Sequence, residues 1–275
     1  MNTIPERIAK QVAWVQKRPG FNRAQNILEV GAGAFTTLAE LAQRYPDKQF
    51  SGVDHELRPP ALALAEQAPG NLQILRHDVR NLSLFSAEQF DFVYSAAVLE
   101  HIKELPEHLA EVYRILRPGG RYCFSTAPLW SSSQGHHCDH NAADCPIPHY
   151  AHLFKTRAQL GDFLIAERGK SPDQSAQILR RVYDRKDLSR LSRTQVRQII
   201  ENSAFEIESW KEGGDKNCTK ALIRAVEENN VYGLDLADLK ISSIVGSLLK
   251  ISDKDKQPSI WQTWLGRLLP SRKND

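Results

Sequence analysis

The sequence has little of several features that would assign it to a specialised class of protein. Its 275 residues include four cysteines, Cys123, Cys138, Cys145 and Cys218. It contains no run of about 18 apolar residues, the length that a membrane-spanning helix needs. Its first residues are polar, so neither a secretory leader nor a transmembrane segment is expected. Few cysteines in a chain of this length do not indicate a disulfide framework, and we expect reduced thiols and a cytoplasmic protein.

The chain also lacks a strong charge of one sign. Its formal net charge is +3, and Lys and Arg are scattered among acidic residues. Because nucleic-acid binders concentrate their basic residues in a patch or stripe, no nucleic-acid partner is expected. The hydrophobic share of 41% and the charged share of 25% are ordinary for a folded protein. The length fits one large domain, or one domain with an appendage.

Strand-like and helix-like segments alternate between residues 26 and 127. Short apolar runs predict strands at 26–30, 49–54, 72–78, 90–95 and 121–127. Between them, apolar residues recur at helical spacing and end at proline or glycine. Such alternation predicts a parallel sheet covered by helices on both faces.

The remainder of the chain breaks this rhythm. Residues 128–203 begin with a long loop rich in Ser, His, Pro and Asn, followed by expected helices. A loop of that length in a compact domain is usually functional or disordered. Strands are predicted at 204–212 and 241–249, with a helix at 217–229 between them. A helix is the competing interpretation of 241–249. The predicted fold class is α/β: a Rossmann-like three-layer sandwich with a mostly parallel seven-stranded sheet and a helical and loop insertion before the last two strands.

A glycine turn follows the first predicted strand, in the sequence Glu29-Val30-Gly31-Ala32-Gly33-Ala34. Glycine allows the backbone to turn sharply and to approach a ligand closely. Open α/β sheets bind nucleotides at this place, beyond the carboxyl ends of the strands. The alternative is a tight turn without a ligand.

The next strands end in residues that suit the same ligand. Asp54 ends the second predicted strand, where a carboxylate can accept hydrogen bonds from both hydroxyls of a ribose. Asp78 ends the third, where it can accept a bond from an adenine amino group. Ser95-Ala96-Ala97 ends the fourth with small side chains. Each acid alone fits a turn or a helix cap. Together with the glycine turn, the two acids predict a nucleotide site along one edge of the sheet.

At these residues the chain resembles the class I S-adenosylmethionine-dependent methyltransferases. The similarity runs from Asn26 to Pro128 and includes ILEVGAGAFTTLAELA, SGVDHE, LRHDVRNL, FDFVYSAAVLEHI and EVYRILRPGGRYCFSTAP. It implies an enzyme that uses S-adenosyl-L-methionine. The cofactor-binding residues implied by the resemblance are Glu29, Gly31 and Gly33 for the methionine end, Asp54 for the ribose, and Asp78 and Val79 for the adenine, with Ala32, His55, Ser95 and Ala96 beside them.

Two details bear on this assignment. Many members of the family carry a third glycine where this chain has Phe35, so the side chain of Phe35 is expected against the cofactor or the N-terminal helix. A nicotinamide dinucleotide site would need glycine at Thr36. The alternatives to an active methyltransferase are an NAD-dependent oxidoreductase or epimerase, and a catalytically inactive methyltransferase-like binding protein.

The acceptor of the methyl group is expected to be a small molecule or a glycan, methylated at oxygen. A hydroxyl acceptor needs a general base, and histidine is the usual residue near neutral pH. The candidates are His101, His136 and His137. The segments WSSSQGHHC and IPHYAHLFKTRAQLGDFL are similar to a loop of bacterial methyltransferases that modify glycans. His101 could instead start a helix, and the histidines could belong to a lid over the substrate.

A zinc site and a membrane contact are the other hypotheses for this part of the chain. Residues 136–152 hold enough His and Cys for a zinc site, but no C-x2-C pair is present and no metal is predicted. The tail SIWQTWLGRLLPSRKND has the pattern of a basic amphipathic helix, which could contact a membrane surface or pack on protein. The protein is expected to be a monomer or a homodimer.

These features divide the chain into five parts. They are a helical cap at 1–25, whose helix uses Ile8, Val12 and Val15, an S-adenosylmethionine-binding core at 26–128, a substrate-side loop and helical insertion at 129–203, the last strands of the sheet at 204–250, and an amphipathic tail at 251–275.

Overall fold

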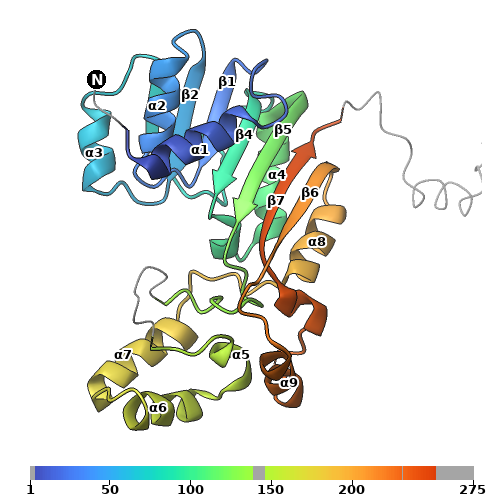
Figure 1. The fold of residues 1–275 in the computed structure, drawn as a ribbon. Helices are drawn as coiled ribbons and strands as arrows, with labels where there is room; N and C mark the ends of the chain where they lie inside the picture. The colour runs from blue at the N-terminus through green and yellow to red at the C-terminus, as the bar shows by residue number, and fades with distance from the viewer. Residues whose placement is uncertain (1–3, 139–145, 231, 252–275) are drawn as a thin grey trace, which may run out of the picture.

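The computed structural model describes residues 4–138, 146–230 and 232–251. Its centre is a seven-stranded sheet with the order β3-β2-β1-β4-β5-β7-β6 (Figure 1). The strands are β1 Asn26–Val30, β2 Gln49–Asp54, β3 Leu72–Arg76, β4 Phe90–Ala96, β5 Leu116–Thr126, β6 Glu206–Gly214 and β7 Ile241–Leu249. Strand β7 pairs antiparallel with β5 and β6, and the other pairings are parallel. The fold is the Rossmann-like α/β sandwich that the sequence predicts.

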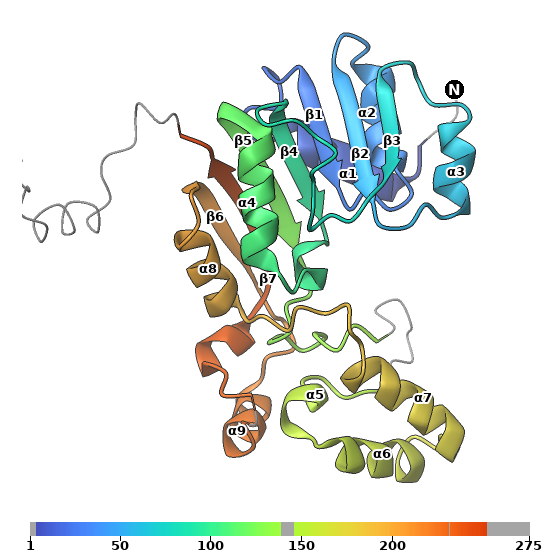
Figure 2. The same ribbon diagram turned by 180° about the vertical axis from the view of Figure 1, so that it is seen from behind.

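A hydrophobic core lies on each face of this sheet, between the strands and the helices that cover them. The helices concerned are α1 Glu6–Gln16, α2 Thr36–Arg44, α3 Pro59–Ala65, α4 Leu105–Ile115 and α8 Arg193–Glu201. Residues of α1, α2 and α3 pack with Ile27 of β1 on one face. Residues of α4 and α8 pack with Leu28 and Val30 on the other (Figure 2). Successive side chains of a strand point to opposite faces, so Ile27, Leu28 and Val30 of β1 are apolar because both faces of the strand are buried.

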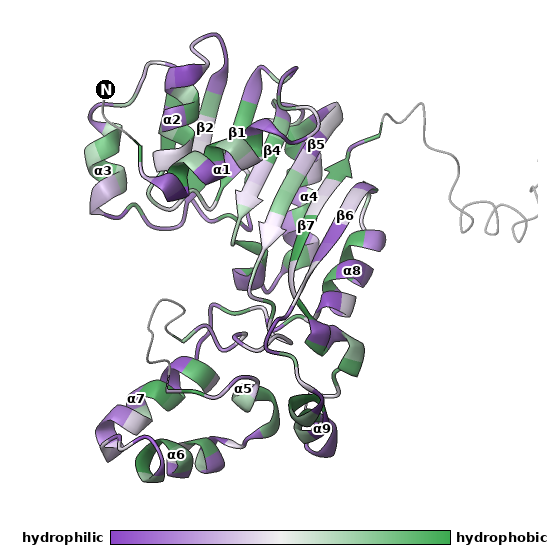
Figure 3. Cartoon of the chain, viewed as in Figure 1, coloured by the Kyte–Doolittle hydropathy of each residue, from purple (hydrophilic) through white to green (hydrophobic). Residues whose placement is uncertain are grey.

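The two ends of the sheet differ in polarity. Strand β1 lies inside the sheet, and its residues after Asn26 are all buried. Strand β6 forms an edge, and its residues are exposed or half-buried. Figure 3 shows hydrophilic residues along much of β6 and hydrophobic ones along the central strands. A polar, solvent-exposed edge strand resists pairing with other chains.

A helical lobe lies beyond the ends toward which β4 and β5 point (Figures 1 and 2). Its elements are α5 Ala151–Phe154, α6 Arg157–Ala166, α7 Pro172–Tyr183, α9 Lys220–Glu228 and the 3-10 helix η2 Leu236–Lys240. A further 3-10 helix, η1 Leu99–His101, follows β4. Helices α6, α7 and α8 each begin with a capping box, in which Thr156, Ser171 and Ser192 accept from the amide three residues on. The Ser or Thr and the Gln three residues later therefore mark the start of each of the three helices in the sequence.

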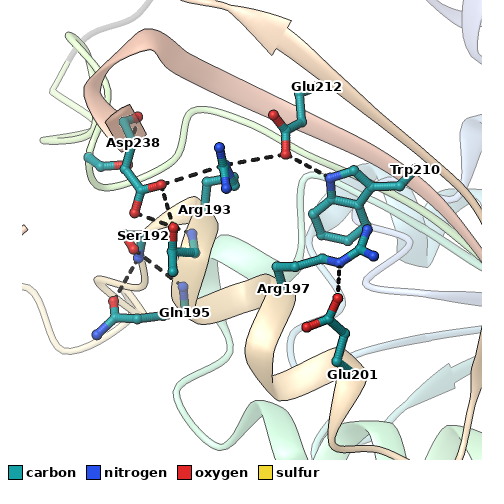
Figure 4. Close-up of polar contacts among 10 residues, drawn as sticks. Ser192, Arg193, Gln195, Arg197, Glu201, Trp210, Glu212 and Asp238 are labelled. Carbon is teal, nitrogen blue, oxygen red and sulfur yellow. Dashed lines mark hydrogen bonds and ion pairs between the residues drawn. The ribbon is translucent and has the colours of Figure 1, made fainter. Parts of the chain in front are cut away.

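Helix α8 is tied to the β6–β7 connection by a cluster of polar contacts (Figure 4). The buried carboxylate of Asp238 in η2 accepts from the Thr194 hydroxyl at 2.8 Å. Arg193 lies within 3.5 Å of the same carboxylate and 3.3 Å from Glu212 of β6. The Arg197 guanidinium stacks over the Trp210 ring at 4.9 Å. These contacts fix the last helix of the insertion against the antiparallel end of the sheet.

The expected elements are present, with small differences at their ends. Strand β3 ends at Arg76 rather than at residue 78, so Asp78 lies in the loop beyond it. Strand β5 begins at Leu116, before the predicted start at residue 121. Residues 241–249 form a strand, because both of their sides pair with neighbours.

Two further predictions concern the C-terminal tail and membrane-spanning helices. The predicted amphipathic tail lies outside the described residues from 252 onward. In the part of the chain that the structure does describe, none of the helices combines the length and the apolar character that crossing a bilayer requires.

Candidate cofactor and acceptor site

A cavity of about 950 Å³ opens at the carboxyl ends of the parallel strands. That volume is in the range of small-molecule sites. The side of the cavity that carries the glycine turn is lined by Gly31 and Gly33 after β1, Asp54 and His55 at β2, Asp78 and Val79 after β3, and Ala97 and Val98 after β4. Its other side is lined by His101, Ile102, Lys103, Glu104, Arg185, Lys186 and Asp187. The ends of neighbouring strands and a distant loop therefore enclose one space.

The two glycines of the turn serve different purposes. Both have positive φ, +70° at Gly31 and +57° at Gly33. A Cβ at Gly31 would lie 2.4 Å from a methyl group of Val98, so the wall of the cavity leaves no room for a side chain there. A Cβ at Gly33 would meet no protein atom within 4 Å. Gly31 thus permits close packing, and Gly33 leaves the backbone open to a ligand.

Asp54 connects the end of β2 to this turn. One of its carboxylate oxygens accepts from the Gly33 amide at 2.9 Å, and the other accepts from the Glu56 amide at 3.1 Å. The His55 ring, whose side chain is 74% exposed, lies 3.0 Å from the same carboxylate. A carboxylate has about four acceptor positions, so Asp54 can accept a further bond from a ligand hydroxyl.

Asp78 follows β3 on the same side of the cavity, in an ion pair with Arg80. The bidentate contact with Arg80 holds the pKa of Asp78 at about 2. Arg80 also lies 3.3 Å from Glu104 at the start of α4. The carboxylate of Asp78 therefore remains ionised at neutral pH, on a loop braced against α4.

A buried chain of hydrogen bonds supports the neighbouring Val79. The carbonyl of Val79 accepts from Nδ1 of His108 at 2.8 Å, which leaves Nε2 of His108 to accept from the Tyr122 hydroxyl at 3.1 Å. Tyr122 in turn lies 2.8 Å from the hydroxyl of Ser95. Burial lowers the pKa of His108 to about 4, so its ring is neutral. Ser95 belongs to this internal chain and does not line the cavity.

Glu29 is also held inside the protein. It is buried, and the Tyr94 hydroxyl donates to its carboxyl group at 2.9 Å. Burial raises the pKa of Glu29 to about 8. Of the ten predicted cofactor residues, Gly31, Gly33, Asp54, His55, Asp78 and Val79 line the cavity, whereas Glu29, Ala32, Ser95 and Ala96 do not.

The three candidate bases lie in different environments. His101 lines the cavity, and its Nδ1 is 2.9 Å from the main-chain carbonyl of Asp187. The ring of His137 stands edge-on to it, with 5.2 Å between the ring centres. His136 is buried, and its Nδ1 accepts from the Cys138 amide at 3.1 Å. The structure thus brings His101 and His137 together and turns His136 into the interior of the loop.

The hypothetical zinc ligands are only partly covered by the structure. His140 and Cys145 lie outside the described residues. Among the residues that are described, no three His, Cys, Asp or Glu side chains are grouped as metal ligands would be.

Comparison with known proteins places the sheet end of this site in a family. Residues 28–124 match the family described as methyltransferase domain. The chain is 36% identical over 94 residues to trans-aconitate 2-methyltransferase of Deinococcus radiodurans, covering 34% of each protein. It is 28% identical over 118 residues to ubiquinone biosynthesis O-methyltransferase of Pseudomonas fluorescens, covering 42% of this chain and 50% of that protein. Residues 28–124 therefore form a class I S-adenosylmethionine-dependent methyltransferase domain.

The similarity is concentrated in this methyltransferase domain. The aligned parts span about a third to a half of the length of these curated relatives. A solved geranyl diphosphate C-methyltransferase from Streptomyces coelicolor, in complex with Mg²⁺, geranyl diphosphate and S-adenosyl-L-homocysteine, has a TM-score of 0.51 at 10% identity. The alignment covers 88% of this chain and 79% of that one. At that identity it supports the shared fold.

Phe35 stands where many methyltransferase domains carry a third glycine. Its backbone has φ of +59°, the left-handed conformation that glycine adopts easily. Its ring is fully buried in the core formed with α1, and it lies against Gly52 of β2. A Cβ at Gly52 would lie 2.7 Å from that ring. Phe35 therefore points toward the N-terminal helix, one of the two places that the sequence predicts.

The sequence missed the loop residues that close the methyltransferase cavity. Arg185, Lys186 and Asp187 lie between α7 and α8 and line the cavity beside His101. The charged run at 184–187 is a weak signal, because such runs are common in exposed loops. Its place beside His101 depends on contacts across 86 residues of sequence.

Proposed function

We propose that the protein binds S-adenosyl-L-methionine in this cavity and transfers its methyl group to an oxygen atom of a small-molecule or glycan acceptor. The proposal rests on one observation: two groups of residues with different chemistry line the same cavity. One part of its lining presents the glycine turn, Asp54 and Asp78, and the other presents His101. We further propose that the segment 129–203 supplies the acceptor side of the site.

The cofactor-side residues fit the cofactor chemically. The open backbone at Gly33 can face the methionine end, because no side chain occupies that space. The carboxyl oxygens of Asp54 and Asp78 can accept bonds from hydroxyl and amino groups. When bound, S-adenosylmethionine supplies a methyl group whose bond to sulfur breaks with the electron pair left on sulfur. Its methyl group is already activated, so the chain's task is to align the acceptor and to exclude water.

His101 supports an acceptor that must lose a proton. Its Nδ1 faces a carbonyl oxygen, which can only accept, so Nδ1 carries the hydrogen. Nε2 of the neutral ring is then the basic nitrogen. A hydroxyl group needs such a base, whereas a neutral amine or a thiolate does not. The named relatives do not distinguish an oxygen acceptor from a carbon acceptor, because they include an O-methyltransferase and a C-methyltransferase.

The proposal is tested by methyl incorporation. The full chain is incubated with methyl-labelled S-adenosylmethionine and a protein-free cell extract, and labelled products are identified by mass spectrometry. We expect a labelled methyl ether, which is lost in Asp54→Ala. Cofactor binding without any labelled product would favour the inactive binding protein. Stabilisation by NAD in place of S-adenosylmethionine would favour the oxidoreductase.

A further inference from the structure

The loop between α7 and α8 is attached to the turn that carries His101 by two adjacent hydrogen bonds. Nδ1 of His101 donates to the Asp187 carbonyl at 2.9 Å. The Ser189 amide donates to the Glu100 carbonyl at 2.8 Å. The Glu100 carboxylate is itself buried and accepts from the Thr126 hydroxyl at 2.7 Å. His101 therefore stands between a fixed strand end and a loop that comes from the insertion.

Arg185 braces this loop from inside the cavity wall. Its Nε donates to one carboxylate oxygen of Asp187 at 2.9 Å, and its terminal nitrogen bonds the other. Its remaining nitrogen donates to the His137 carbonyl at 3.2 Å. The guanidinium holds the pKa of Asp187 at about 2, so this carboxylate is ionised whenever the pair is intact. One side chain thus joins the Asp187 loop to the histidine loop that follows β5.

The Asp187 carboxylate is close enough to act on the charge of His101. It lies 3.7 Å from Nδ1, on the same side as the carbonyl that accepts from this nitrogen. The side chain of His101 is 34% exposed, and its Nε2 has no hydrogen-bond partner among residues 4–138, 146–230 and 232–251. The ring is therefore held at one nitrogen and available at the other.

We infer that Arg185 and Asp187 are positioning residues that fix His101 in the tautomer whose Nε2 accepts the proton of a hydroxyl acceptor. The inference rests on the proposed methyl transfer and adds the class of acceptor, an alcohol or phenol. As the acceptor oxygen takes the methyl group, its proton passes to Nε2, and the imidazolium later releases that proton to water. The carboxylate of Asp187 stabilises the imidazolium while it lasts.

The tautomer can be observed without knowing the acceptor. Long-range proton–nitrogen spectra of the full chain labelled with ¹⁵N-histidine report which ring nitrogen carries hydrogen. The His101 signal is identified by its absence in His101→Asn. At about pH 8, where neutral imidazole predominates, we expect hydrogen on Nδ1 in the wild-type protein and a mixture of the two tautomers in Arg185→Ala. Arg157→Ala is the matched control, because Arg157 forms an exposed ion pair with Asp184 in the same lobe.

Activity gives a second measurement. We expect Arg185→Ala to lower the rate of methyl incorporation at saturating cofactor by about tenfold or more, since a displaced base costs rate. Cofactor affinity should stay within about twofold, because Arg185 bonds Asp187 and the His137 carbonyl rather than the glycine turn. If Arg185→Ala does not fold, as judged by its thermal melt, Asp187→Asn decides, since it keeps the side-chain size and removes the charge. Asp187→Asn should then lower the rate in the same way.

The outcomes separate this inference from the proposed function. A single unchanged Nδ1–H tautomer and a wild-type rate in Arg185→Ala, or a wild-type rate in Asp187→Asn, would overturn the positioning role and leave methyl transfer intact. A wild-type protein that binds no S-adenosylmethionine would instead remove the proposed function, whatever the tautomer of His101.

Discussion

The two walls of the cavity are built in different ways. The cofactor wall is made by the ends of β1, β2, β3 and β4, which are neighbours in the sheet. The acceptor wall is made by the turn after β4 and the loop before α8, and the loop after β5 is braced against it. The first wall follows from the order of strands. The second depends on hydrogen bonds between loops that are distant in sequence.

This difference separates two properties of the protein. Changes in the cofactor wall should affect cofactor affinity, because that wall presents the open backbone and the carboxylates. Changes in the acceptor wall should affect the rate of transfer, because we propose that this wall holds the base. A cofactor-wall variant that changed only the rate, or an acceptor-wall variant that changed cofactor affinity, would contradict this separation.

The largest effect is expected on the acceptor wall, at His101. His101→Asn keeps a donor toward the Asp187 carbonyl but has no basic nitrogen. The rate of methyl incorporation should fall about 10²- to 10⁴-fold, the usual contribution of a general base. Cofactor affinity, measured by calorimetry, should change less than about twofold. Retained activity would remove His101 as the base, and lost cofactor binding would show that the walls are not separate.

The next effect is expected on the cofactor wall, at Gly31. Gly31→Ala places a Cβ 2.4 Å from Val98 at φ of +70°, so the turn or Val98 must move. We expect a loss of about 2–4 kcal/mol of stability from strain and overpacking. Cofactor affinity should fall at least about tenfold, because Val98 lines the cavity.

Gly169→Ala is the matched control for Gly31. Gly169 has φ of +61°, and a Cβ there would meet nothing within 4 Å. Its backbone strain is similar, but it does not line the cavity, so stability should fall by about 1 kcal/mol with unchanged affinity. Equal affinities in the two alanine variants would contradict the role of the turn. Thermal melts measure the stability, and calorimetry measures the cofactor affinity.

A smaller effect depends on pH. Burial raises the pKa of Glu29 from 4.5 to about 8, so folding favours its protonated form. Between these values the folded state binds more protons than the unfolded state, and stability falls as pH rises. We expect a loss of about 2 kcal/mol from pH 6 to pH 8 that is absent in Glu29→Gln. Denaturant unfolding at both pH values measures it. Parallel pH profiles for the two proteins would show that Glu29 does not titrate in this way.

The smallest effect is expected at the start of α8, at a residue that does not line the cavity. Ser192 accepts from the Gln195 amide at 3.3 Å and caps the helix. Ser192→Ala should cost about 1 kcal/mol, the usual value of a cap. Neither cofactor affinity nor the rate should change. A change in rate would mean that α8 transmits strain to the Asp187 loop, which would sharpen the account of the acceptor wall.

The sequence signals for the cofactor wall are local, and six of the ten residues predicted there line the cavity. The apolar run at β1, the glycines after it and Asp54 at the end of β2 each reflect a few neighbouring residues. Even here, sequence order does not reveal which side chains face the cavity. Ser95 follows the pattern of a cofactor residue, yet its hydroxyl lies 2.8 Å from that of Tyr122 inside the protein.

The acceptor wall is harder to predict because its contacts are long-range. The histidine-rich loop predicts His136 and His137 equally, and only packing turns His136 inward beside His152, with 5.3 Å between their rings. Asp187 reaches His101 through its main-chain carbonyl, a group that every residue possesses. No residue type or spacing can signal such a contact.

Titration calorimetry of the full chain with S-adenosyl-L-methionine tests the central claim most directly. We predict one binding site per chain for the wild-type protein, and affinity at least about tenfold lower in both Gly31→Ala and Asp54→Ala. No heat of binding for the wild-type protein, or the same affinity in all three proteins, would contradict a cofactor site at the carboxyl edge of the sheet.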